Sequence, residues 1–124
     1  MQEQAIIDGN KLIAEFLKYP EGFPHKIDEY GYEQTVEGFK IEDNDVALED
    51  LRFHKSWDWL MPVVEKIEEY NNHVSIMNKS CCIFPKGKNI SHSYTNGYIN
   101  KNSKIEATWF AIVEFIKWYN KCQK

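Results

Sequence analysis

The chain has 124 residues, of which 43% are hydrophobic and 15% aromatic, enough apolar material for one buried core. No stretch approaches the length of about 20 apolar residues that a membrane-spanning helix needs, and Met1-Gln2-Glu3-Gln4 lacks the pattern of a secretory signal. Three cysteines, an odd number, do not form a disulfide framework and favour a reducing compartment. We therefore expect a single domain over residues 1–124, in the cytoplasm and with no membrane partner.

The net charge of −4 conceals a strong asymmetry along the chain. Residues 20–50 hold ten acids against two lysines, a balance of −8, whereas residues 79–124 hold eight lysines against two glutamates, a balance of +6. Either the two regions lie close together and neutralise each other, or they form separate acidic and basic fields that steer different parts of a partner. The sequence leaves both interpretations open.

The first predicted helix covers residues 4–18, where Ile6, Ile13 and Phe16 follow a helical spacing and Pro20 ends the pattern. Residues 20–50 contain prolines, glycines and scattered aromatics without a sustained period, which predicts a long irregular acidic loop, relieved at most by a short strand near residues 32–41. Loops of this length are uncommon in compact domains and are often functional. Its acids are our first candidate partner-binding residues: Glu42, Asp43, Asp45, Glu49 and Asp50.

A second helix is predicted over residues 57–70, with Trp57, Leu60, Val63, Val64 and Ile67 on its apolar face. Pro62 predicts a kink, or a helix that begins nearer Asp58. Strands are predicted at 73–77, 81–85 and 89–94. The first two are joined through Asn78-Lys79-Ser80, and the third is followed by a hairpin turn at Asn96-Gly97.

The last helix is predicted over residues 104–120 and begins with a capping box, Ser103-Lys104-Ile105-Glu106. Its core-facing stripe contains Ile105, Trp109, Ile112, Ile116 and Tyr119, flanked by Thr108, Val113 and Phe115. Phe110 falls among the charges of the opposite face. It is either an ordinary surface aromatic or, with Glu114 and Lys117, part of a partner-binding patch.

These elements predict an α+β fold, in which a small antiparallel sheet of three or four strands packs with three helices around an αββ(β)α core. The segments Ser56 to Glu68, Ser103 to Trp109 and Val113 to Asn120 resemble small uncharacterised phage and prophage proteins of the Bacteroidetes. In outline they are similar to the phage ABA-sandwich domain, in which a sheet lies between helical layers. The resemblance covers residues 53–120, implies a phage origin, and transfers no catalytic residues.

No motif in the sequence carries catalytic chemistry. Cys81 and Cys82 point to opposite faces of a strand, so they do not share one metal ion, although either could pair with His54, His73 or His92. Asp43-Asn44-Asp45 lacks the glycine and the spacing of a calcium loop. We therefore expect a protein that is not an enzyme and that needs no cofactor or metal.

The leading functional hypothesis is a phage- or prophage-encoded binding protein that contacts a host protein and inhibits it. Its most concrete form is an anti-defence inhibitor of the anti-CRISPR kind, acting on a nucleic-acid-processing effector. The alternative is a small protein that binds single-stranded RNA or DNA, with lysines for phosphates and rings for base stacking. Its candidate residues are Lys86, Lys88, His92, Tyr94, Tyr98 and Lys101.

Overall fold

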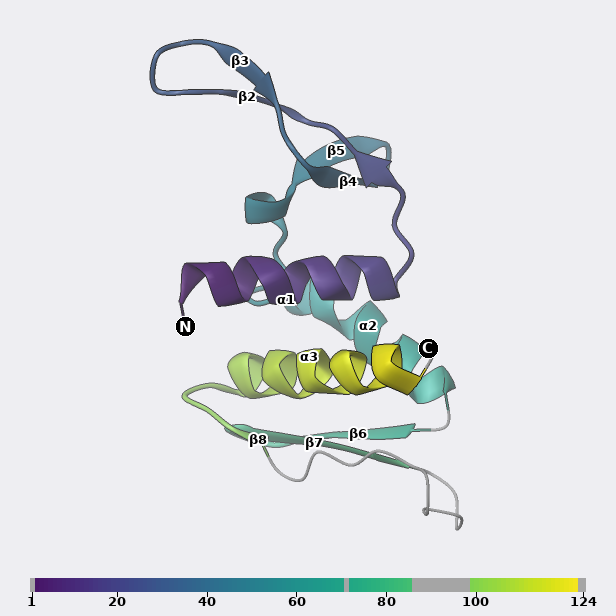
Figure 1. The fold of residues 1–124 in the computed structure, drawn as a ribbon. Coiled ribbons are helices and arrows are strands. Elements are labelled where there is room, and N and C mark those ends of the chain that lie inside the picture. Colours follow the sequence, from purple (N-terminus) through teal and green to yellow (C-terminus); the bar gives the residue numbers. More distant parts are fainter. Residues whose placement is uncertain (1, 71, 86–98, 123–124) are drawn as a thin grey trace. The chain divides into compact units, whose positions relative to one another are not determined.

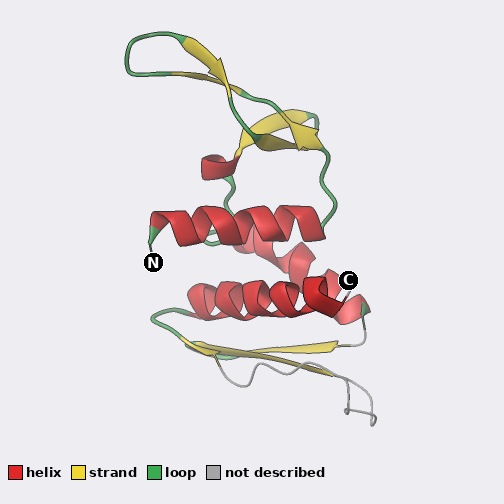
Figure 2. Cartoon of the chain, in the orientation of Figure 1, coloured by secondary structure: helices red, strands yellow, loops and turns green. Residues whose placement is uncertain are grey.

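The structure, a computed structural model, describes residues 2–70, 72–85 and 99–122. The contacts of the chain gather in two compact units, residues 1–51 (unit 1) and 52–124 (unit 2). The fold class is α+β, as the sequence predicts: the described residues contain three helices and small antiparallel sheets of two or three strands (Figure 2). The single domain expected over residues 1–124 stays a prediction.

Unit 1 combines one helix with short antiparallel strands in the orders β1-β4-β5 and β2-β3 (Figure 1). Its elements are α1 (Glu3–Phe16), β1 (Glu21–Gly22), β2 (His25–Ile27), β3 (Glu33–Thr35), β4 (Gly38–Ile41), β5 (Asn44–Ala47) and the 3-10 helix η1 (Leu48–Asp50). The irregular loop expected over residues 20–50 is therefore wrong, since most of this segment lies in strands and tight turns. The strands have only two to four residues each, too few to leave a visible period in the sequence.

Two glycines of this segment, Gly22 and Gly38, lie in paired strands and not in loops. Gly22 of β1 pairs with Gly38 of β4. A Cβ atom built on Gly38 would lie 2.1 Å from the carbonyl oxygen of Val46, so the β4–β5 pair tolerates no side chain there.

The core of unit 1 is small and consists of Ile13, Ala14, Phe16, Phe39, Ala47 and Leu51. The buried Asn10 joins α1 to Leu51, the last residue of unit 1. Its Nδ2 donates to the carbonyl oxygen of Leu51 at 3.2 Å.

A left-handed residue ends α1. The N–H of Lys18 donates to the carbonyl of Glu15 at 3.0 Å, and the N–H of Tyr19 donates to that of Ala14 at 3.1 Å, which is the Schellman arrangement. Lys18 has a φ of +61°, a conformation that favours glycine. The helix therefore ends before Pro20 by its own cap.

The described residues of unit 2 form two helices and a sheet of order β6-β7-β8 (Figure 1). Its elements are α2 (Trp57–Glu69), β6 (Asn72–Ile76), β7 (Ser80–Pro85), β8 (Ile99–Asn100) and α3 (Lys104–Cys122). The helix α3 packs along β7 and β8, and α2 packs beside β6. β6 and β7 lie within one residue of the predicted strands 73–77 and 81–85. The predicted strand 89–94 lies outside the described residues.

The helix α2 runs through Pro62 and begins at Trp57. Leu60, Val63, Val64 and Ile67 are buried, and Trp57 is half-buried. After the helix, the buried Asn72 donates from Nδ2 to the carbonyl of Tyr70 at 3.0 Å and to that of Ile67 at 3.4 Å. The carbonyl of Ile67 also accepts from the N–H of the C-cap residue Tyr70 at 3.1 Å, so Asn72 adds side-chain bonds to the end of the helix.

The buried face of α3 is wider than the predicted stripe. Trp109, Ile112 and Ile116 are buried as expected, whereas Ile105 and Tyr119 are half-buried. The flanking residues Thr108, Val113 and Phe115 are buried as expected, and Ala107 and Ala111 broaden the face. At the start of the helix, Ser103 Oγ accepts a hydrogen bond from the N–H of Glu106 at 3.2 Å, which is the serine half of the predicted capping box.

The Ser103 cap predicts a measurable loss of stability on Ser103→Ala. The free energy of unfolding should fall by about 1 kcal/mol, because the Glu106 N–H loses its acceptor at the helix start. Urea unfolding monitored by tryptophan fluorescence measures the change. Ser103→Asp is the matched control, because it keeps an acceptor at this position and should stay within about 0.5 kcal/mol of the original chain. Equal losses in both variants would contradict the assigned cap.

The cap of α1 predicts the opposite sign for Lys18→Gly. The free energy of unfolding should rise by about 0.5–1 kcal/mol, since glycine adopts the left-handed conformation without steric penalty. Lys18→Ala removes the same side chain without this freedom, and it should give no gain. Thermal and urea unfolding of the three chains distinguish the effect of the backbone from the effect of the lost charge.

Candidate functional site

The largest exposed apolar side chains of unit 1 lie on and beside the β2–β3 hairpin, which projects from the β1-β4-β5 sheet of the same unit (Figure 1). The exposed fractions are 55% for Phe23, 75% for Ile27, 78% for Tyr30 and 71% for Tyr32. We call residues 23–35 the aromatic hairpin. Exposed rings are the residue type most often found as energetic anchors in protein interfaces.

A single aspartate organises the loop that carries the two tyrosines. Asp28 Oδ1 accepts hydrogen bonds from the N–H groups of Tyr30 and Tyr32, both at 2.9 Å, and Oδ2 accepts from Gln34 Nε2 at 3.0 Å. The N–H of Asp28 donates to the carbonyl of Tyr32 at 2.9 Å, and Gly31 supplies the positive φ of +85° that closes the turn. The rings therefore sit on an ordered backbone, which reduces the entropy lost when a partner binds.

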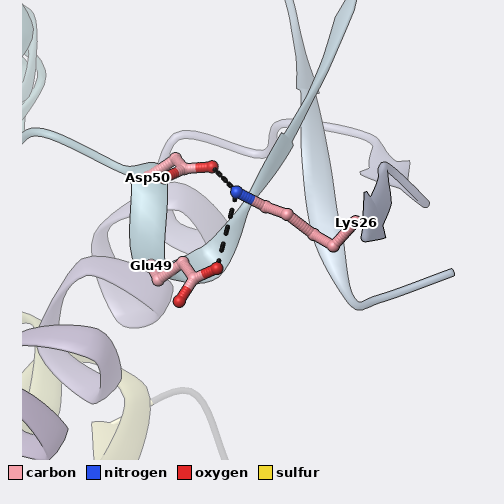
Figure 3. Close-up of polar contacts among 3 residues, drawn as sticks. All are labelled: Lys26, Glu49 and Asp50. Atoms are coloured by element: carbon pink, nitrogen blue, oxygen red, sulfur yellow. Dashed lines mark hydrogen bonds and ion pairs between the residues drawn. The ribbon is translucent and has the colours of Figure 1, made fainter. Parts of the chain in front are cut away.

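Lys26 fastens the aromatic hairpin to the rest of unit 1. Its Nζ lies 2.5 Å from Asp50 Oδ2 and 3.5 Å from Glu49 Oε1, both on η1 (Figure 3). The hydrogen bond to Asp50 is the main cause that raises the pKa of Lys26 above its usual value. Because these groups are exposed, the pairs orient the hairpin more than they stabilise the fold. A backbone bond from the N–H of Val36 to the carbonyl of Pro24, 3.0 Å long, closes the base of the hairpin.

The charge asymmetry of the sequence follows the division into units. Unit 1 has thirteen acids and four lysines, a formal charge of −9, and unit 2 has a formal charge of +5. The aromatic hairpin thus belongs to a strongly acidic unit. Such a unit attracts basic surfaces and repels nucleic-acid phosphates.

The five predicted acidic contact residues occupy two places in unit 1. Glu42 and Asp43 form the two-residue turn between β4 and β5, with φ values of +51° and +69°, and Asp45 follows on β5 opposite Lys40. Glu49 and Asp50 lie on η1, and both form ion pairs with Lys26 of β2. Their part in binding stays a prediction, but two of them already hold the aromatic hairpin in place.

The predicted patch on the last helix is already engaged within unit 2. Phe110 is half-buried, its ring meets Trp109 edge-on at 5.1 Å, and Lys101 Nζ lies 4.1 Å from its centroid. Glu114 and Lys117 form an ion pair of 3.6 Å. Phe110 is therefore less available as an anchor than its position among charges indicates, and its role in binding stays a prediction.

The nucleic-acid alternative rests mainly on residues that lie outside the described part of the chain, namely Lys86, Lys88, His92, Tyr94 and Tyr98. Lys101 is described and exposed, with its ammonium group over the Phe110 ring. This alternative also stays a prediction.

The aromatics of residues 20–50 are visible in the sequence, but their spacing does not show that they form one exposed set. The signal was present in Asp28-Glu29-Tyr30-Gly31-Tyr32, because an aspartate followed by glycine at this spacing is typical of a tight loop. Recognising a hairpin there would have placed Tyr30 and Tyr32 at its tip. The role of Lys26 had no signal, because its acidic partners lie more than 20 positions away.

Neither the environment of Cys81 nor the grouping of acids in the described residues indicates a nucleophile or a metal site. Burial raises the pKa of the Cys81 thiol to about 11, whereas a nucleophilic cysteine needs a lowered value. Within residues 2–70, 72–85 and 99–122, no three His, Cys, Asp or Glu side chains gather so that they could hold a metal ion. In the same ranges, no helix is long and apolar enough to cross a bilayer.

The environment of Cys81 predicts slow reaction of the native protein with a thiol reagent. At pH 8, dithionitrobenzoate should modify the exposed Cys122 promptly, and the buried Cys81 and Cys82 only after unfolding in guanidinium. The Cys122→Ser variant should therefore have no thiol that reacts rapidly, and rapid modification of this variant would contradict the burial of Cys81 and Cys82.

The pKa of Cys81 also links the stability of the fold to pH. Because the folded pKa of Cys81 lies above the reference value of 9.0, the fold favours the protonated thiol, and this contribution to stability is lost as the pH rises through about 11.

Comparison with known protein families, curated proteins and solved structures finds no match for this chain. The resemblance to phage proteins and to the ABA-sandwich domain therefore stays a prediction, as does the phage origin it implies. Function has to be inferred from the geometry and charge of the described residues. Their most distinctive surface is the aromatic hairpin of the acidic unit 1.

Proposed function

We propose that this chain is a non-enzymatic binding protein whose acidic unit 1 docks on a basic surface of another protein and inhibits it. Its concrete role, in this proposal, is that of a phage- or prophage-encoded anti-defence protein, an inhibitor of the anti-CRISPR kind. The observation that carries the proposal is the aromatic hairpin, with Ile27, Tyr30 and Tyr32 each more than two thirds exposed.

The side-chain chemistry of the hairpin supports binding to a protein. Tyrosine offers a large apolar face with one polar end and has few rotatable bonds, so it makes contacts at a low entropic cost. The order that Asp28 gives to the loop lowers this cost further. The core of unit 1 is built from other residues, so the exposed rings are free to contact a partner without disturbing it.

The electrostatics of unit 1 favour a basic partner over nucleic acid. A formal charge of −9 on residues 1–51 repels phosphates, so the stacking of bases on Tyr30 and Tyr32 would be opposed. The same charge accelerates encounter with a lysine- and arginine-rich surface. Proteins that process nucleic acids carry such surfaces in their binding channels, and an acidic unit with aromatic anchors can occupy one.

The proposal predicts that capture of a partner depends on the two tyrosines. Immobilised chain is exposed to bacterial lysate in parallel with the Tyr30→Ser/Tyr32→Ser variant, and retained proteins are identified by mass spectrometry. A basic, nucleic-acid-processing protein should be retained by the original chain and lost from the variant by at least tenfold, since each anchoring ring contributes on the order of 2 kcal/mol. Addition of stoichiometric chain should then inhibit the purified partner in its own activity assay.

Met61→Ser is the matched control for this experiment, because it removes an exposed apolar side chain from unit 2. It should retain the partner as the original chain does. If the tyrosine variant retains the same proteins as the original chain, the aromatic hairpin is not the binding surface. If a partner is bound but keeps its full activity, the inhibitory role is wrong.

A further inference from the structure

An open pocket lies at the base of the aromatic hairpin in unit 1. It has a volume of about 300 Å³. Its lining residues come from three segments of unit 1, namely α1, the link between β3 and β4, and the end of β5 with η1: Ile7, Val36, Glu37, Ala47, Leu48 and Glu49. Val36 and Glu37 directly follow β3, and Glu49 is a partner of Lys26 on β2. The pocket is thus connected to the hairpin by covalent structure and by an ion pair.

The lining combines apolar walls with negative groups. Ile7, Val36, Ala47 and Leu48 supply hydrocarbon surface, and Glu37 and Glu49 supply two exposed carboxylates. Each carboxylate has a lysine beside it: Lys11 Nζ lies 3.0 Å from Glu37 Oε1, and Lys26 Nζ lies 3.5 Å from Glu49 Oε1. The hydrogen bond to Glu37 is the main cause that raises the pKa of Lys11. The pocket walls therefore suit a long side chain that is apolar along its stem and cationic at its end.

We propose that this pocket binds an arginine side chain from the basic surface of the partner. The inference rests on the proposed function and names one subsite of it. The arginine stem would lie against Ile7 and Leu48, and its guanidinium group would donate to the carboxylates of Glu37 and Glu49. Arginine fits better than lysine because its planar head is more weakly hydrated and can donate two parallel bonds to a carboxylate.

The lysines already present do not block this binding. A carboxylate accepts up to about four hydrogen bonds, so a lysine on one oxygen leaves capacity for a guanidinium group. The pairs with Lys11 and Lys26 are exposed and therefore weak, so an incoming arginine can displace them. Lys11 thereby acts as an internal competitor for the subsite.

The test uses the full chain and two defined peptides, acetylated and amidated hexa-arginine and hexa-lysine, in low-salt buffer. Methyl NMR follows Ile7 and Leu48, and isothermal titration calorimetry measures affinity. Hexa-arginine should shift both methyl signals in a saturable way and bind about fivefold more tightly than hexa-lysine. Glu37→Gln/Glu49→Gln should weaken hexa-arginine about tenfold, since the charge-assisted bonds are lost. Lys11→Gln should strengthen it, because the competing ammonium group is removed.

Glu15→Gln/Glu21→Gln is the matched control, because it removes two exposed charges of the same unit that do not line the pocket. It should weaken hexa-arginine by about twofold or less, the effect of net charge alone. If the pocket double variant unfolds, the two single variants Glu37→Gln and Glu21→Gln give the same comparison. Equal losses in the pocket variant and the control variant, or no shift at Ile7 and Leu48, would overturn the inference.

The outcomes separate this inference from the proposed function. If hexa-arginine ignores the pocket while capture of a partner still requires Tyr30 and Tyr32, the binding function stands and only the arginine subsite falls. If capture does not depend on the tyrosines, the proposed function falls, whatever the peptides do. A loss of about tenfold in hexa-arginine affinity in Glu37→Gln/Glu49→Gln, together with a loss of about twofold or less in the control, is the result that supports the subsite.

Discussion

The surface of unit 1 depends on where its small core ends. Burial of large side chains reaches Phe39 on β4 and Leu51 after η1, and it does not extend to the β2–β3 hairpin, whose six strand residues are exposed or half-buried. A two-stranded hairpin without a packed face is marginally stable by itself. This one is supported by polar contacts instead: Asp28 inside the loop and Lys26 at the base. Because the rings have no core to enter, they remain exposed.

The pocket adjoins the base of the hairpin, because its lining residues Val36 and Glu37 directly follow β3. Gly38 lets β4 and β5 approach so closely that no side chain fits between them. The chain then turns through η1, where Glu49 both borders the pocket and contacts Lys26. Exposed rings and a pocket with two carboxylates in one unit resemble the usual division of an interface into apolar contacts and charged specificity. In unit 2, by contrast, Phe110 contacts Trp109 and Lys101 of its own unit.

The fold of unit 2 was accessible from the sequence to a large extent. The capping serine, the stripe of Trp109, Ile112 and Ile116, and the face of α2 all follow from local periodicity, because a helix buries one side of its own surface. The hairpin of β6 and β7 follows from alternation and a short turn. Residues 20–50 were not accessible in this way. Their strands are shorter than one visible period, and their glycines serve strand contacts that only the partner strand reveals.

The candidate site shows the same division between local and long-range information. The sequence by itself determined the α+β class, the acidic character of residues 20–50 and the positions of the two main helices of unit 2, because composition and helical spacing are local properties. The tertiary structure alone decided that Tyr30 and Tyr32 stay exposed, that Lys26 joins Glu49 and Asp50, and that Ile7 lines a pocket with Glu37. The physical reason is that exposure, ion pairing and cavities depend on which distant segments meet, and no local period encodes those meetings.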